Sequence, residues 1–156
     1  MSRFHRDDAP SLVRAARQDA SLTQAELAGM TGMSQSTLAQ IESGRRAVSA
    51  ELLERILRAA DYRPSVPLAR YAPSISSYAQ ERGLGSLRVF GSVAWGTDGF
   101  ESDIDLIGTP TRDLSLFELA DIASFASELT GFPTEVHADN HVPEALRAAI
   151  DEAVAL

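Results

Sequence analysis

The chain has 156 residues, of which 44% are hydrophobic and 23% charged, a composition typical of a globular protein. It contains no Cys, which excludes a disulfide framework, a thiolate zinc site and a cysteine nucleophile. The net charge of −8 is uneven: residues 1–66 hold nine Arg against eight acidic residues, and residues 67–156 hold five Arg against fourteen. Such acidity argues against nucleic-acid binding by the second half without a metal.

Residues 1–9 are polar, and we expect them to fray. They contain no apolar segment of the signal-peptide type, and no stretch of the chain is apolar over the length of a membrane span. We therefore expect a cytoplasmic protein without a membrane partner.

Four short helices are predicted before residue 62. The first begins near Ser11, where Leu12, Val13 and Ala16 recur at helical spacing. The other three begin after residues whose hydroxyl can cap a helix: Thr23, Ser34 and Ser49. Four short helices joined by tight turns make a small bundle.

Three consecutive segments of this bundle carry a helix-turn-helix pattern. They are LTQAELA at residues 22–28, TGMSQSTL at residues 31–38 and IESGRR at residues 41–46. The pattern resembles the Xre/phage-repressor family of DNA-binding domains over residues 11–62. The resemblance implies that the helix capped by Ser34 enters the major groove, and that Arg17 and Glu42 form a partly buried ion pair.

The same resemblance assigns the DNA contacts. The base-facing positions are Gln35, Ser36 and Gln40, and the phosphate-facing positions are Gln24, Arg45 and Arg46. The chemistry fits, because Gln can pair bidentately with adenine and Ser can read either base type. The other interpretation is a helical interaction module that has lost DNA binding, which the near-neutral charge of residues 1–66 would suit.

Prolines at positions 64, 67 and 73 indicate a semi-rigid linker after the bundle. We therefore expect a DNA-binding domain over residues 1–64, a linker over 65–73 and a second domain over 74–156. Ser74 is the expected start of the next helix, and Gly83 and Gly85 follow its end.

The second domain is predicted around two short strands. Leu87 to Phe90 form the first, Gly91-Ser92 end it, a helical turn follows near Ala94, and Asp103 opens the second strand. Asp103 and Asp105 share one face of that strand, since side chains alternate. Two neighbouring carboxylates repel unless a divalent cation joins them, and Mg²⁺ prefers carboxylate and phosphate oxygens. The alternative is a surface strand with two solvated Asp residues.

The remaining elements complete a small mixed sheet. A long helix is predicted over 114–129, a third strand over 134–139 and a final helix over 144–154. The expected fold class is a helical bundle with a helix-turn-helix, followed by a small mixed-sheet α/β core.

This stretch resembles the DNA polymerase beta-like nucleotidyltransferases, and within them the minimal nucleotidyltransferases. The motif reads GSVAWG at residues 91–96 and, five residues later, SDIDL at residues 102–106. The resemblance implies magnesium at Asp103 and Asp105 and nucleotide binding by Gly91, Ser92 and Ser102. It also implies a third catalytic acid, for which Glu135 is the best match and Asp139 the fallback. Trp95 stands where the family usually has Arg.

Taken together, the two resemblances imply a bifunctional antitoxin. It would bind operator DNA, as a homodimer or in a toxin–antitoxin hetero-oligomer, and transfer a nucleoside monophosphate from ATP, with Mg²⁺, to a partner toxin of the HEPN ribonuclease type. Two alternatives stay open: a transcription regulator whose second domain only senses nucleotide or scaffolds a partner, and a toxin that modifies tRNA, which the acidic second half opposes.

Overall fold

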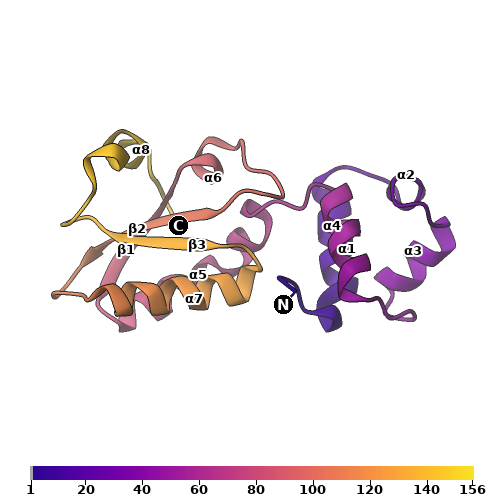
Figure 1. Ribbon diagram of the computed structural model, residues 1–156, viewed down its shortest axis with the longest axis horizontal. Helices are drawn as coiled ribbons and strands as arrows, with labels where there is room; N and C mark the ends of the chain where they lie inside the picture. Colours follow the sequence, from indigo (N-terminus) through magenta and orange to yellow (C-terminus); the bar gives the residue numbers. More distant parts are fainter. Residues whose placement is uncertain (1) are drawn as a thin grey trace.

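The computed structural model describes residues 2–156 (Figure 1). The helical part contains η1 (Arg6–Asp8), α1 (Ala9–Asp19), α2 (Gln24–Met30), α3 (Gln35–Glu42) and α4 (Ala50–Ala59). The second part contains α5 (Ser65–Glu81), β1 (Leu84–Phe90), α6 (Ser92–Trp95), β2 (Ile104–Pro110), α7 (Leu116–Thr130), β3 (Thr134–Ala138), η2 (Glu144–Leu146), α8 (Arg147–Asp151) and β4 (Val154–Ala155). The expected class, a helical bundle followed by a mixed-sheet α/β core, is confirmed.

The helix starts in the bundle follow local side-chain chemistry. The Thr23 hydroxyl accepts from the backbone N–H of Glu26, whose carboxylate accepts from the Thr23 N–H, a complete capping box. Ser34 and Ser49 cap α3 and α4 in the same way. All three predicted caps are therefore present, and they fix where the helices of the helix-turn-helix begin.

The sheet has the strand order β3-β2-β1-β4, with β2 and β3 parallel and the other pairs antiparallel. Its apolar face carries buried Val89, Leu106 and Val136, and the long helices α5 and α7 cover it (Figure 1). The opposite face carries Asp105 and Glu135 together with the buried side chains of Phe90 and Ile107, and the short helices α6 and α8 lie on this side (Figure 1). Strand alternation therefore places two carboxylates on the sheet face opposite to α5 and α7.

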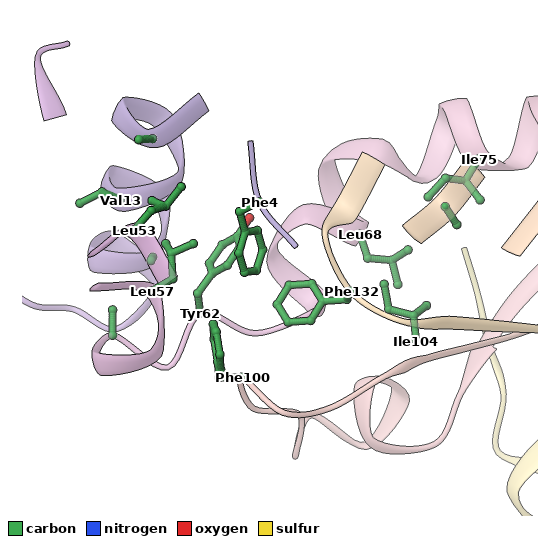
Figure 2. Close-up of a cluster of buried hydrophobic side chains, with 14 of the residues drawn as sticks. Phe4, Val13, Leu53, Leu57, Tyr62, Leu68, Ile75, Phe100, Ile104 and Phe132 are labelled. Carbon is green, nitrogen blue, oxygen red and sulfur yellow. The ribbon is translucent and has the colours of Figure 1, made fainter. Parts of the chain in front are cut away.

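An aromatic cluster joins the two parts (Figure 2). Phe4 is 4% exposed, and its ring lies 5.7–6.1 Å from the rings of Tyr62, Phe100 and Phe132. The Arg3 guanidinium donates to the backbone carbonyls of Gly131 and Phe100. The expectation that the N-terminal residues fray is therefore wrong for this segment, because burial of one aromatic side chain fixes it.

Residues 65–73 are helical, which corrects the expectation of a linker and of a helix beginning at Ser74. They form the first half of α5, whose first backbone N–H, that of Ser65, donates to the buried Asp98 carboxylate at 2.8 Å. Pro67 lies in the first turn, where no amide donor is needed, and Pro73 lies on the exposed side. The start of α5 is thus capped by a residue 33 positions away.

The C-terminus also differs from expectation. The helix predicted over 144–154 is divided into η2 and the five-residue α8, and the chain then forms β4. In β4, Ala155 and Val154 pair with Arg88 and Val89 of β1, and the Leu156 N–H donates to the Leu87 carbonyl. The free edge of β1 offers hydrogen bonds that the helix would not have used.

Among residues 2–156, no helix is both long and apolar enough to cross a membrane.

Candidate functional site

Two regions hold the residues predicted to bind DNA or nucleotide: the end of the bundle around α3, and the sheet face that carries Asp105. In Figure 1, α3 lies at the end of the molecule far from the sheet.

A hydrogen-bonded chain supports the start of α3. The Arg17 guanidinium donates to both carboxylate oxygens of Glu42, at 2.6 and 3.1 Å. The Gln24 amide donates to Glu42 at 3.0 Å and accepts from the Gln35 amide at 2.9 Å. The predicted ion pair is therefore present, and it continues through Gln24 to the first residue of the recognition helix.

The predicted DNA-facing side chains of α3 and of the turn after it are exposed to solvent. Gln35, Ser36 and Gln40 are exposed on α3, and Arg45 and Arg46 are exposed in the turn after it. The backbone N–H groups of both Arg residues donate to the Gln40 carbonyl, so this turn is ordered. Three polar side chains with two cations beside them can supply base and phosphate contacts.

On the sheet, the strand register brings two predicted acids together. Asp105 of β2 pairs with Phe90 of β1 on one side and with Glu135 of β3 on the other. Gly91 follows Phe90 with a φ of +72°, and a Cβ there would lie 2.7 Å from a carboxylate oxygen of Asp105. Only glycine lets this turn approach the carboxylate so closely. Gly91, Asp105 and Glu135 thus form one cluster, which we call the acidic row.

The acidic row is not neutralised by the protein. Burial, and then the negative charges of Asp103 and Glu135, raise the pKa of Asp105, while His137 opposes the rise. Within residues 2–156, neither Asp103 nor Asp105 forms an ion pair. An added positive charge would therefore stabilise the ionised carboxylates of this cluster.

A metal would need ligands beyond this chain. Over the described range, 2–156, no group of three or more His, Asp or Glu side chains is placed to hold a metal ion. The un-neutralised carboxylates and the space kept by Gly91 nevertheless fit a hard divalent cation that takes its remaining ligands from phosphates and water. Asp103, exposed just before β2, and Asp105 are the residues that would hold it.

The two predicted serines differ in their surroundings. Ser92 is the first residue of α6 and half-buried. The Ser102 hydroxyl accepts from the Gly99 N–H at 3.0 Å, so it also orders the loop that leads to Asp103.

The two candidate acids on β3 and after it, Glu135 and Asp139, have different surroundings. Glu135 lies beside Asp105, whereas Asp139 accepts from the Arg88 guanidinium at 3.0 Å and from the Thr109 hydroxyl at 2.6 Å. Asp139 is thus committed to partners at the other end of β3. His137 lies between them, and its buried Nε2 atom is 3.6 Å from Glu135 and has no hydrogen-bond partner among the described residues.

Sequence reasoning missed two features of this region. One is a groove of about 530 Å³ on the same face, which is lined by both basic and acidic side chains: Arg88, His141, Arg147, Asp139 and Asp151. The other is the hydrogen bond from the Trp95 indole N–H to Glu152. Neither has a local sequence signal, because each joins residues more than fifty positions apart.

Comparison with known proteins gives a match in the helical part of the chain. A family model described as helix-turn-helix matches residues 13–66. This segment is a helix-turn-helix. The match supports a DNA-binding regulator and covers α2, α3 and α4 with most of α1. No curated protein matches the chain.

Proposed function

We propose that this protein is a bifunctional antitoxin: an operator-binding repressor whose sheet domain transfers a nucleoside monophosphate to a partner toxin. The helix-turn-helix match and the exposed side chains of α3 support the first activity. The observation that carries the second is the acidic row, where Gly91 leaves room beside Asp105 and Glu135 is its strand neighbour.

The chain's residues would divide the transfer among them. Asp103 and Asp105 would hold Mg²⁺, which supplies positive charge to the nucleotide phosphates when bound. Gly91 and Ser92 would hold the outer phosphates through backbone N–H groups and a hydroxyl. The acceptor oxygen bonds to the α-phosphorus, the bond to pyrophosphate breaks, and Glu135 takes the hydroxyl proton.

The proposed acceptor is a Tyr, Ser or Thr hydroxyl on a toxin protein of the HEPN type. Residues 67–156 carry five Arg against fourteen acidic residues, so their surface suits a basic protein better than a phosphate backbone. The same charge disfavours tRNA as the substrate.

The transfer is tested by incubating the partner toxin with this protein, ATP and Mg²⁺ and measuring the partner's intact mass. We expect the mass to rise by one nucleoside monophosphate. Asp103→Asn and Asp105→Asn should abolish the rise, and Ser92→Ala should slow it because the backbone donors remain. Asp113→Asn, at an exposed Asp outside the acidic row, is the matched control.

One observation favours a second candidate function, a regulator whose sheet domain only binds nucleotide or a partner. Trp95 replaces the usual Arg of the resembled motif, and its indole is engaged by Glu152. Neutralisation of the toxin without added mass, with any of the four nucleoside triphosphates, would establish this candidate and reject transfer.

Repressor function is tested separately on the protein's own promoter. Gln35→Ala and Gln40→Ala should each weaken specific binding by about 1–3 kcal/mol and leave non-specific binding unchanged. Gln18→Ala, an exposed Gln on α1 outside the recognition helix, should change neither. A wild-type protein without sequence preference at low salt would contradict the repressor role.

A further inference from the structure

A cavity of about 380 Å³ lies at the junction of the two parts, away from the acidic row and from α3. The segment around Arg3 and Phe4 forms one wall, α1 contributes Leu12 and Ala15, and α5 and the end of α7 close the rest. Pockets for small ligands typically measure about 300–1,000 Å³ and favour domain interfaces. Both the size and the position of this cavity fit that class.

The Tyr62 side chain gives the cavity a polar group. Tyr62 lines it, and its side chain as a whole is 2% exposed. Burial raises the pKa of this hydroxyl, and the nearby Arg70 guanidinium only partly opposes the rise. The group is thus protonated at neutral pH and can donate a hydrogen bond to a ligand in the cavity.

Arg70 supplies a positive charge at the same place. Its guanidinium lies 5.3 Å from the centre of the Tyr71 ring and makes no ion pair with any residue of the described chain. Leu12, Ala15 and Leu129 add apolar surface. The Tyr62 hydroxyl and the exposed Arg70 guanidinium, which can both donate to an anion, therefore stand beside an apolar wall.

We propose that this cavity binds a small apolar molecule with one anionic head group, of the aromatic carboxylate or sulfonate class. The head group accepts from the Tyr62 hydroxyl and pairs with Arg70, and the apolar body contacts α1 and α7. Asp8 and Glu128, which also line the cavity, disfavour a second negative charge. The site is independent of nucleotide transfer, and the ligand would bridge the helix-turn-helix part and the sheet part.

The proposal is tested with two fluorescent probes that differ by one group. 8-Anilinonaphthalene-1-sulfonate carries the anionic head, and N-phenyl-1-naphthylamine lacks it. We expect one molecule of the sulfonate to bind per chain of the native, full-length protein. Arg70→Gln and Tyr62→Phe should each weaken the sulfonate about tenfold and leave the uncharged probe unchanged.

Matched variants separate the cavity from non-specific binding. Arg147→Gln removes an exposed Arg outside the cavity and should change neither probe. Ala15→Phe should fill the cavity and weaken the binding of both probes. If this variant lacks a cooperative melting transition, Leu12→Trp takes its place. The proposal is overturned if the sulfonate does not bind or if more than one molecule binds per chain. It is also overturned if sulfonate binding is unchanged in both Arg70→Gln and the filling variant.

Discussion

At the scale of single residues, Asp105 holds a position that is energetically unfavourable for an ionised carboxylate. Its pKa is raised, so between the ordinary value and the raised value the native state binds more protons than the unfolded state. Stability is therefore lost as the pH rises through this interval, and at neutral pH the ionised carboxylate destabilises the fold.

We accordingly predict that Asp105→Asn raises the melting temperature at pH 7 by about 1–3 °C in the absence of metal. The gain should disappear below the ordinary pKa of aspartate, where both proteins are uncharged at this position. Mg²⁺ should raise the melting temperature of the wild type and leave that of the variant unchanged. A lower melting temperature for Asp105→Asn, with Asp113→Asn unchanged, would show that the carboxylate is already satisfied.

Single residues also show how far the sequence alone reaches. The caps at Thr23, Ser34 and Ser49 act within three positions, so they could be predicted from neighbouring residues. The Arg17–Glu42 pair followed from a resemblance that spans the whole bundle. The adjacency of Asp105 and Glu135 required the register of two strands, and no local signal predicts the contact of Asp98 with Ser65 or of Phe4 with Phe132.

At the scale of elements, α3 is held in place by a buried charge. The Glu42 side chain is 3% exposed. Burial alone would raise the pKa of Glu42, but the hydrogen bonds from Arg17 and Gln24 bring it below its ordinary value. This contribution to stability is present above the ordinary glutamate pKa and is lost as the pH falls through the lower, folded value.

Arg17→Ala should lower the free energy of unfolding by about 3 kcal/mol at pH 7, because it leaves a buried carboxylate uncompensated. The difference from wild type should shrink as the pH falls below the ordinary glutamate range. Chemical denaturation followed by circular dichroism measures both. Arg55→Ala, on the exposed surface of α4, is the control, and an equal loss there would deny Arg17 a special role.

The start of α5 depends on a residue from another element. The Asp98 side chain is fully buried, and beside its bond to Ser65 it lies 3.5 Å from the Arg63 guanidinium. Asp98→Ala should cost about 1–2 kcal/mol and speed hydrogen exchange at the Ser65 amide. Asp98→Asn, which retains an acceptor oxygen, should lose less. Unchanged exchange at Ser65 in Asp98→Ala would contradict the cap.

At the scale of the whole molecule, the two parts share one hydrophobic core. Buried residues run without interruption from the bundle through Phe4 and Tyr62 to Phe132 and the sheet (Figure 2). The loop 97–103, which ends at Asp103, is also attached to the bundle, since the Phe100 N–H donates to the Asp61 carboxylate and Arg58 pairs with Glu101. A movement of the bundle would be transmitted directly to this loop.

Phe4→Ala should lower the free energy of unfolding by about 3–5 kcal/mol, the usual cost of removing a buried aromatic ring. Phe117→Ala is the matched control, because that ring is 89% exposed on α7 and should contribute little. Equilibrium denaturation of both variants measures the difference. Equal stabilities would mean that the N-terminal segment detaches in solution.

The cap that Asp98 provides for α5 has a consequence for protein engineering. Consider a chimera that joins this helix-turn-helix to a different effector domain at residue 64. It would lack the Asp98 carboxylate, which accepts from the Ser65 N–H. It would also leave the Phe4 ring without its contacts to Phe100 and Phe132. The reverse chimera would expose the same apolar surface from the other side. When domains of this protein are exchanged, the segments 2–8 and 97–103 must therefore be transferred together with the residues that they contact.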